Sequence, residues 1–275
     1  MAQMDPQDMM EQEKRLKENV AKIKHTLIVM SGKGGVGKST VAVNLAYALS
    51  LAGKKVGILD VDLHGPNIAK MLGIENKTII TGESGIEPVE VSENLKAISI
   101  ALLGHDPDQP IIWRGPAKAG VIKQFLSDVN WGEIDYLVVD SPPGTGDEPL
   151  SVCQLIPGAS GIIIVTTPQD VSVLDARKSV LFASQINIPV AGIIENMSGF
   201  VCPHCHAETD IFKKGGGERA AQELNVPFLG RVPFQPEFVE FGDKGTPFVS
   251  FGYKSVSSDA FMGIVAKVKE FTGDR

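Results

Sequence analysis

The chain has 275 residues, of which 43% are hydrophobic, and 26 basic against 33 acidic residues give it a net charge of −7. This length suits one large or two small domains with an ample core. The acidic balance argues against DNA or an anionic membrane as a partner. No apolar run approaches the roughly 20 residues of a membrane span, and the N-terminus lacks a signal peptide's apolar stretch. We therefore expect a cytoplasmic protein without nucleic-acid or membrane partners.

Short apolar runs alternate with helical stretches along most of the chain. The segment Asp5–Lys24 is mostly polar, but its few apolar residues recur at helical spacing. This pattern predicts an N-terminal helix that lies on the domain or on a partner. Near-continuous apolar strands that alternate with helices indicate an α/β fold, with a mostly parallel central sheet and helices on both faces. We expect a helical extension over 1–25 and a single domain over 26–275. The predicted strands are 26–30, 55–60, 95–101, 135–140, 161–167, 190–196 and 226–232, and the predicted helices include 38–53, 116–128, 172–186, 217–224 and 259–271.

The segment GKGGVGKST matches the phosphate-binding pattern G-x-x-x-x-G-K-[ST]. Glycines let a loop turn its backbone N–H groups toward phosphate oxygens, and the following helix adds the positive end of its dipole. Lys38 is expected to reach the β- and γ-phosphates, and the Ser39 hydroxyl to bind Mg²⁺. The predicted nucleotide-binding residues of this loop are Gly32, Lys33, Gly34, Gly35, Val36, Gly37, Lys38, Ser39 and Thr40.

Three aspartates follow predicted strands, where ligands gather in a parallel sheet. Asp140 ends an apolar strand as the Mg²⁺-side aspartate of a nucleotide hydrolase does, and Gly144 in the turn after it can offer its N–H to the γ-phosphate. Asp60 and Asp62 follow another strand, so that one can support the Mg²⁺ shell and the other can orient the attacking water. We expect Asp60 and Asp140 to lie just outside the direct Mg²⁺ ligands, and Asp60, Asp62, Lys33 and Lys38 to serve catalysis.

The order and wording of six segments closely resemble the Mrp/ApbC family of P-loop ATPases that carry iron–sulfur clusters. The resemblance runs from about Thr26 to the C-terminus, and the wider class of deviant Walker A (SIMIBI) NTPases includes MinD, ParA and the nitrogenase iron protein. The segments are GKGGVGKST, LDVDLHGPNIAKMLG, WRGP, VVDSPPGTGD, TTPQDVSVLDARKS and ENMSGFVCPHC.

The resemblance implies roles that the residue pattern alone does not give. Lys33 would be the signature lysine that reaches the nucleotide of a partner subunit, which implies a homodimer. Asp62 would position the attacking water, and Asp60 would lie close to Mg²⁺. Asn196 would contact adenine, with Pro233 beside the base.

Cys202 and Cys205 form a CxxC pair in a metal-binding loop at about 199–206. One pair supplies only two thiolates, whereas most clusters and structural zinc sites need four ligands. Within one chain, His204, His206 or Cys153 could complete a zinc site, and a redox dithiol is a third interpretation. Across a two-fold axis, two copies of the pair supply four thiolates. The resemblance also indicates a bridging [4Fe–4S] cluster, although zinc can occupy the same thiolates in aerobically purified protein.

We therefore expect a homodimeric, Mg²⁺-dependent, slow ATPase that binds ATP and ADP and passes [4Fe–4S] clusters to apo iron–sulfur proteins. The alternatives are a positioning ATPase of the MinD/ParA sort and a nucleotide-dependent scaffold with a structural zinc. A positioning ATPase has no need of a cysteine pair, so Cys202 and Cys205 separate the first hypothesis from this alternative.

Overall fold

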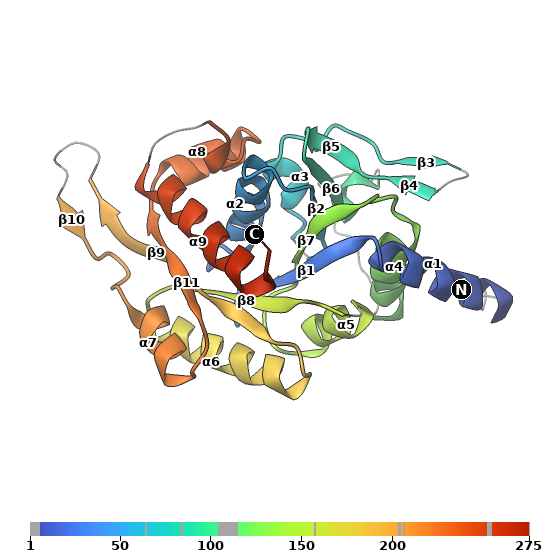
Figure 1. Ribbon diagram of the computed structural model, residues 1–275. Helices are drawn as coiled ribbons and strands as arrows, with labels where there is room; N and C mark the ends of the chain where they lie inside the picture. The colour runs from blue at the N-terminus through green and yellow to red at the C-terminus, as the bar shows by residue number, and fades with distance from the viewer. Residues whose placement is uncertain are drawn as a thin grey trace.

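The computed structural model describes residues 6–63, 65–82, 85–103, 115–156, 158–202, 205, 207–251 and 255–274. Helices and strands alternate through most of this chain (Figure 1). The helices are α1 (Pro6–Val20), α2 (Lys38–Leu51), α3 (Ile68–Met71), α4 (Gly115–Asp128), α5 (Asp147–Leu155), α6 (Asp170–Gln185), α7 (Gly216–Glu223), α8 (Glu237–Asp243) and α9 (Val256–Thr272). The strands are β1 (Ile23–Met30), β2 (Val56–Asp60), β3 (Ile80–Gly82), β4 (Gly85–Glu87), β5 (Val89–Ser92), β6 (Leu95–Ser99), β7 (Ile134–Asp140), β8 (Gly161–Thr166), β9 (Val190–Val201), β10 (Glu208–Thr209) and β11 (Phe228–Phe234).

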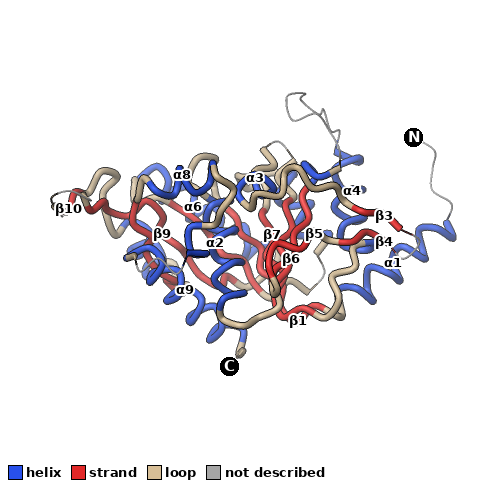
Figure 2. Tube along the Cα trace, turned by 90° about the horizontal axis from the view of Figure 1, so that it is seen from above, coloured by secondary structure: helices blue, strands red, loops and turns tan. Residues whose placement is uncertain are grey.

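The main sheet is mostly parallel, as the sequence predicts. Its order runs β9-β8-β1-β7-β2-β6-β5, with β11 paired to β9 and the short β10 on the far end of β9. Only β5 on β6 and β10 on β9 are antiparallel among these pairs. Helices α2 and α9 lie on one face and α5, α6 and α7 on the other, so the central strands are covered on both sides (Figures 1 and 2).

Burial explains why the central strands read as continuous apolar runs. Residues 27–30 of β1 and residues 162–164 of β8 are fully buried, because each strand meets helices on both faces. A strand with one solvated face would alternate polar and apolar residues instead. The sheet therefore forms a rigid base, and its carboxyl-terminal edge carries the loops described below.

Several element boundaries differ from the sequence prediction. The N-terminal helix ends at Val20 because Ile23 and His25 already pair with β7 as part of β1. The strand predicted over 95–101 ends at Ser99, where a short 3₁₀ turn begins. The strand predicted over 190–196 continues to Val201. The elements α3, α8, β3, β4, β5 and β10 were not predicted from the sequence.

Helix α1 lies beside α4 (Figures 1 and 2). The Asn19 side-chain amide donates to the Ser127 carbonyl oxygen at 2.6 Å, and Arg15 pairs with Asp128 at 3.3 Å. The predicted helix thus packs on the body of the chain. Trp113 and Arg114 of the WRGP segment lie outside the described residues. Within the described residues, no helix is both long and apolar enough to span a bilayer.

Candidate nucleotide site and cysteine hairpin

The loop between β1 and α2 requires glycine at specific positions. Gly37 has φ of 82°, and a Cβ there would lie 2.3 Å from the Asn196 side-chain nitrogen. A Cβ on Gly32 would lie 2.4 Å from the Asp175 carbonyl oxygen. At Gly34, by contrast, a Cβ would meet nothing within 4 Å. The first and last glycines of the motif are therefore fixed by packing, while Gly34 and its neighbour Gly35 are exposed and leave room for a ligand.

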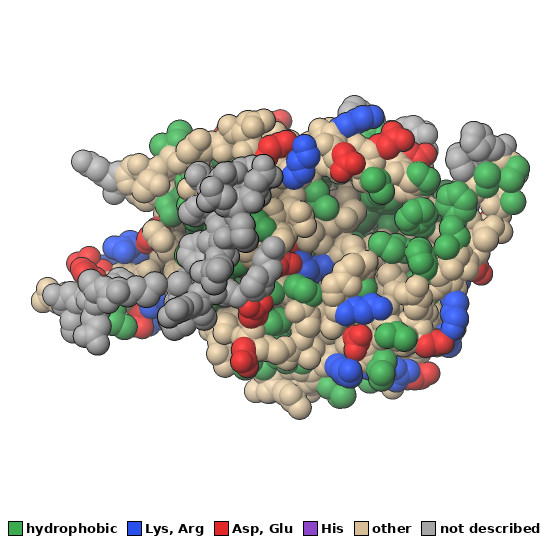
Figure 3. Space-filling model, turned by 180° about the vertical axis from the view of Figure 1, so that it is seen from behind, with side chains coloured by type: hydrophobic (Ala, Val, Ile, Leu, Met, Phe, Trp, Pro, Cys, Tyr) green, Lys and Arg blue, Asp and Glu red, His purple; other side chains and the backbone are tan. Residues whose placement is uncertain are grey.

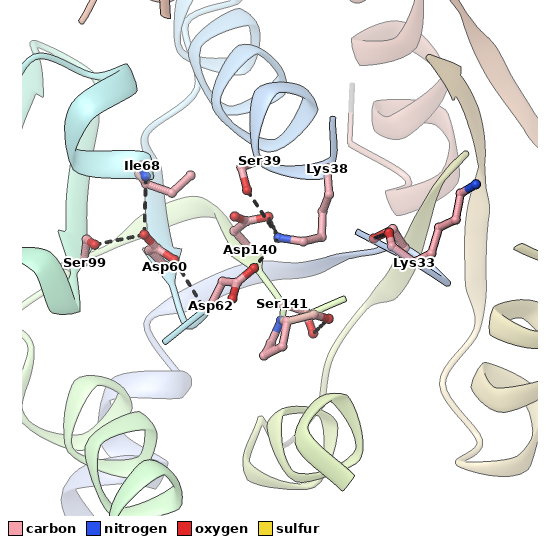
Figure 4. Close-up of polar contacts among 11 residues, drawn as sticks. Lys33, Lys38, Ser39, Asp60, Asp62, Ile68, Ser99, Asp140 and Ser141 are labelled. Carbon is pink, nitrogen blue, oxygen red and sulfur yellow. Dashed lines mark hydrogen bonds and ion pairs between the residues drawn. The ribbon is translucent and has the colours of Figure 1, made fainter. Parts of the chain in front are cut away.

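The Lys38 ammonium lies among the aspartates that the sequence predicts (Figure 4). Its Nζ is 2.7 Å from Asp140 Oδ1 and 3.4 Å from Asp62 Oδ2. It also lies 3.3 Å from the Ser39 hydroxyl oxygen. The site thus brings a buried cation, two carboxylates and a candidate Mg²⁺ ligand together at the start of α2.

Asp60 is fully buried and accepts hydrogen bonds from several directions. The Ser99 hydroxyl donates to Oδ2 at 2.9 Å, and the Asp62 and Ile68 backbone N–H groups donate at 3.1 and 3.4 Å. Burial and the neighbouring charge of Asp140 raise the pKa of Asp60 to about 8. This carboxyl group orients the loop that carries Asp62 through the Asp62 N–H.

Asp140 is 1% exposed, and burial raises its pKa even though Lys38 lies beside it. Its Oδ1 pairs with Lys38, whereas Oδ2 is buried without a hydrogen-bond partner. A buried carboxylate oxygen without a donor is costly unless a cation or a water satisfies it. The Asp140 side chain therefore fits a hydrated Mg²⁺ next to the Ser39 hydroxyl.

Two cavities meet at the start of α2. One of about 220 Å³ lies over the loop and is lined by Gly34, Gly35, Lys38, Ser39 and Asp62, among others. The second, of about 320 Å³, is more apolar, and its walls include Asn196, Pro233 and Phe234. Gly37, Thr40, Asn67 and Met71 line both cavities, so the two lie side by side. A polar compartment for phosphates joined to an apolar one for a base is the shape that a nucleotide needs.

Asn196 connects the second cavity to the phosphate loop. Its side-chain nitrogen donates to the Val36 carbonyl oxygen at 2.9 Å, and the residue is only 7% exposed. The structure thus brings Asn196 and Pro233, which the resemblance implies lie beside adenine, to the wall of one cavity. The remaining wall comes from α3 and α8, through Lys70, Phe238 and Val239. The sequence interpretation missed these residues, because helices of 4 and 7 residues are too short to show a helical spacing of apolar residues.

Lys33 stands apart from this cluster. Its side chain points away from Lys38 and from the three aspartates (Figure 4). Its carbonyl oxygen accepts a hydrogen bond from the Ser31 hydroxyl at 2.9 Å, which fixes the backbone but leaves the side chain directed outward. In this arrangement Lys33 does not reach the phosphate cavity of its own chain.

Gly144 lies in the turn after β7, with φ of 99°. Its N–H, which the sequence assigns to the γ-phosphate, donates to the Ser31 carbonyl oxygen at 2.7 Å. The turn is therefore tied to the end of β1 in this structure. A phosphate contact would require Gly144 to exchange that partner.

The cysteine pair lies at the far end of β9. Strands β9 and β10 pair through Phe200 and Val201, and the Cys202 N–H donates to the Ala207 carbonyl oxygen at 3.0 Å. We call this antiparallel segment, residues 200–209, the cysteine hairpin; it extends beyond the body of the sheet (Figure 1). Cys202 is half-buried and Cys205 is exposed, whereas Pro203, His204 and His206 lie outside the described residues.

Cys153 lies at the opposite end of the molecule. It is 5% exposed and lines a cavity with residues that precede β8 and β9, such as Ala159 and Ile188. Cys202 follows β9, whose 12 residues span about 40 Å if fully extended. Cys153 therefore cannot complete a metal site with Cys202 in one chain. Within the described part of the chain, no group of three or more His, Cys, Asp or Glu side chains could hold a metal ion.

Comparison with known proteins fits this geometry. A family model described as a ParA-type "NUBPL iron-transfer P-loop NTPase" matches residues 22–269. The chain belongs to this family. Its phosphate loop, strand-end aspartates and cysteine hairpin all lie inside the matched range.

Relatives of this iron-transfer P-loop NTPase include proteins named for iron–sulfur clusters. The chain is 56% identical to the iron-sulfur cluster carrier protein of Methanocaldococcus jannaschii, over 94% of this chain and 89% of that one. It is 48% identical to the cytosolic Fe-S cluster assembly factor CFD1 of Kluyveromyces lactis, over 84% of each.

Solved structures agree in fold. A nucleotide-binding protein of Archaeoglobus fulgidus in complex with ADP is 36% identical, with a TM-score of 0.76, and the match covers 89% of this chain and 98% of that one. The cell division ATPase MinD of Pyrococcus furiosus is 21% identical, with a TM-score of 0.64 over 90% of this chain and 99% of that one, which shows the P-loop NTPase fold alone.

Proposed function

We propose that the protein is a homodimeric ATPase that holds a [4Fe–4S] cluster between two copies of Cys202 and Cys205 and transfers it to apo-proteins. The observation that carries the proposal is the course of β9. This strand lines the nucleotide cavity at Asn196 and reaches the cysteine pair six residues later. The names of the relatives supply the cargo, since a carrier and an assembly factor for iron–sulfur clusters are both more than 45% identical to this chain.

The nucleotide half rests on the paired cavities. The polar cavity supplies the N–H groups of the glycine loop and the Lys38 ammonium, and the apolar one offers Asn196 and Pro233 to a base. The ADP complex of the Archaeoglobus fulgidus relative supports the choice of an adenine nucleotide. The residues present also fit Mg²⁺, since the Ser39 hydroxyl can bind it directly and Asp140 can accept hydrogen bonds from its water ligands. The metal would neutralise phosphate charge when bound.

The charges in the site suggest how hydrolysis proceeds. Lys38 must turn from Asp62 and Asp140 toward the phosphates, and the freed Asp62 carboxylate can then orient an attacking water. Asp60 keeps the Asp62 backbone in place through its hydrogen bond to the Asp62 N–H. Gly144 would leave Ser31 and donate to the γ-phosphate, which moves the turn after β7. Positioning and electrostatics dominate such a reaction, and turnover is expected to be slow.

The dimer half rests on Lys33 and on an exposed apolar surface. Lys33 points away from its own phosphate cavity, as a residue that serves a partner's nucleotide would. Val171 and Leu174 at the start of α6 are 67% and 56% exposed, and Ile211 after the hairpin is 52% exposed. Lys213 pairs with Asp170, so these apolar residues belong to neighbouring segments. Figure 3 shows hydrophobic side chains gathered on the side that carries the hairpin. Such a patch favours a protein partner.

Anaerobic reconstitution with iron and sulfide tests the cargo. The parent protein should gain iron–sulfur absorbance near 400 nm and about four irons per dimer, the number that one [4Fe–4S] cluster requires. The Cys202→Ser/Cys205→Ser double variant should gain none, whereas the matched Cys153→Ala control should gain as much as the parent. Equal absorbance in the double variant, or zinc in place of iron in anaerobically prepared protein, would refute cluster carriage.

Hydrolysis and dimerisation are tested at Lys33. Lys33→Ala should bind Mg-ADP with an affinity within about threefold of the parent yet lose at least about tenfold in ATP turnover. The variant lacks the positive charge that would stabilise the transition state, while the rest of the phosphate loop is unchanged. The exposed Lys244→Ala variant is the control. Full turnover by Lys33→Ala, or an ATP-bound protein that stays monomeric by sedimentation, would refute the role across the subunit boundary.

A further inference from the structure

Strand β9 bulges in its pairing with β11 at the nucleotide cavity. Val232 pairs with Asn196, but the next paired residue, Phe234, lies opposite Phe200, so β9 carries two extra residues there. Met197 and Gly199 both have positive φ, 54° and 78°. A bulge of this kind re-aims a strand, and a methionine in the left-handed region costs roughly 1–2 kcal/mol. Residues 197–199 therefore form a strained hinge between the cavity wall and the cysteine hairpin.

Glu195 lies two residues before this hinge and is completely buried. The Ser198 hydroxyl, in the hinge itself, donates to its Oε1 at 2.5 Å. The Gly215 N–H donates to Oε1 at 2.8 Å, and the Gly217 N–H donates to Oε2 at 2.5 Å. Arg231 Nε lies 3.6 Å from Oε1. A buried carboxylate is stable only with such a complete set of donors.

These donors lie on both sides of the cysteine hairpin in the sequence. Ser198 lies on the outgoing strand, whereas Gly215 and Gly217 lie at the start of α7, where the chain returns from the hairpin. One carboxylate thus closes the base of a segment of about 16 residues that contains both cysteines. The start of α7 packs closely here, because a Cβ on Gly216 would lie 2.4 Å from the Pro168 carbonyl oxygen, so position 216 has no space for a side chain.

The nucleotide cavity also contacts the residues at which the cysteine hairpin joins the body of the chain. Asn196, adjacent to Glu195, donates to the phosphate loop at Val36. Phe234 lines the cavity, and its ring centre lies 6.2 Å from that of Phe200 and 6.3 Å from that of Phe212. Phe200 begins the cysteine hairpin, and Phe212 lies on the returning stem just after it. A ligand that displaces Asn196 or Phe234 therefore acts on the hinge and on both stems.

We infer that Glu195 is a positioning residue that couples the nucleotide cavity to the cysteine hairpin, so that nucleotide binding changes the exposure of Cys202 and Cys205. The inference rests on the proposed function, and it assigns the coupling between nucleotide and cysteine pair to one carboxylate. Glu195 touches neither a nucleotide nor a cluster in this scheme. It acts through Ser198 on the hinge and through α7 on the returning stem.

The test measures the alkylation rates of Cys202 and Cys205 by N-ethylmaleimide in metal-free protein, with and without saturating Mg-ADP or Mg-ATP. Parent protein should show at least about a fivefold nucleotide-dependent change, the lower range of typical allosteric couplings. Glu195→Gln keeps the volume of the side chain but replaces one acceptor oxygen by a donor, and it should reduce the change below about twofold. Mg-ADP affinity should stay within about threefold of the parent, because Asn196 and the phosphate loop are unchanged.

Two further variants separate coupling from folding. Ser198→Ala removes only the tie to the hinge and should also lose the nucleotide effect, so it carries the test if Glu195→Gln does not fold. Glu218→Gln is the matched control, since it neutralises another carboxylate that pairs with Arg231 but receives no hydrogen bond from the hinge. A full nucleotide effect in Ser198→Ala or in folded Glu195→Gln, or none in the parent, would overturn the inference. Since no metal is present, failed cluster reconstitution would refute the proposed function without altering this result.

Discussion

Asp60 and Asp140 lie directly opposite each other on the adjacent parallel strands β2 and β7. Both carboxyl groups are buried, at 0% and 1% exposure, and Lys38 contacts Asp140 at 2.7 Å. Burial, and then the charge of the adjacent Asp140, raise the pKa of Asp60 to about 8, although Lys38 opposes the rise. The raised pKa means that folded Asp60 keeps a proton at pH values where an ordinary aspartate is ionised.

This proton makes stability depend on pH. Between about pH 4 and about pH 8 the folded protein keeps a proton on Asp60 that the unfolded chain releases, so the free energy of unfolding should fall as pH rises, by up to about 1.4 kcal/mol per pH unit. Asp60→Asn removes this contribution and should flatten the dependence. Urea unfolding of Mg²⁺- and nucleotide-free protein across this range measures it. The exposed Asp210→Asn variant is the control, and an unchanged slope in Asp60→Asn would contradict the assignment.

The phosphate loop allows a comparison of two glycines. Gly37→Ala places a methyl group 2.3 Å from the Asn196 side-chain nitrogen, at φ of 82°. The expected loss is about 1–3 kcal/mol in the free energy of unfolding, from backbone strain and a displaced Asn196. Gly34→Ala meets nothing within 4 Å and should change that free energy by less than about 0.5 kcal/mol. Chemical denaturation measures both. Equal losses of unfolding free energy in the two variants would contradict the claim that packing requires glycine at position 37 but not at position 34.

Periodicity and motif chemistry predicted the main strands, most of the longer helices and the phosphate loop. Buried strands such as β1 and β8 are apolar throughout, so their type follows from burial on both faces. Asp60, Asp62 and Asp140 could be placed together because parallel strands end at one edge. The pattern could not show that Asp60 and Asp140 are in register, since pairing between distant strands leaves no local signal.

The parts that escaped prediction are short or irregular. Helices α3 and α8, which complete the second cavity, have 4 and 7 residues, too few for a clear helical period. The extension of β9 beyond Asn196 was missed because the bulge at Met197–Gly199 breaks the apolar run. The role of Glu195 could not be predicted either, since the N–H groups that donate to it, at Gly215 and Gly217, follow about 20 residues later and depend on the tertiary fold.

The three cysteines should differ sharply in reactivity. Burial raises the pKa of Cys153 to about 11, so at pH 8 only about a thousandth of this thiol is the reactive thiolate. Cys205 is exposed. Peptide mapping after iodoacetamide treatment of metal-free protein should show Cys153 labelled at least about 100-fold more slowly than Cys205. Urea-unfolded protein is the control, in which both should react alike. Comparable rates in the folded protein would contradict the buried position of Cys153.

Asp274 joins three segments at the edge of the sheet that lies opposite the nucleotide site. Its carboxylate contacts Lys24 and Lys54 at 2.7 Å each and accepts a hydrogen bond from the Tyr136 hydroxyl at 3.0 Å. Burial alone would raise the pKa of Asp274, but these partners hold it well below its usual range. The carboxylate therefore stabilises the fold above about pH 4, the ordinary pKa of an aspartate, and this stabilisation is lost as pH falls further.

The Asp274→Asn variant tests this role. At pH 7 it should lower the free energy of unfolding by about 1–3 kcal/mol, because hydrogen bonds to a charged group are weakened and two lysines lose their counter-charge. The exposed pair Glu240–Lys244 provides the matched control, since Glu240→Gln should cost less than about 0.5 kcal/mol. Chemical denaturation at neutral pH and at about pH 3 measures both variants. The Asp274→Asn deficit should shrink at the lower pH, because the unfolded parent chain already binds a proton at this carboxylate there while the folded protein does not. A deficit that grows instead would show that charge is not its source.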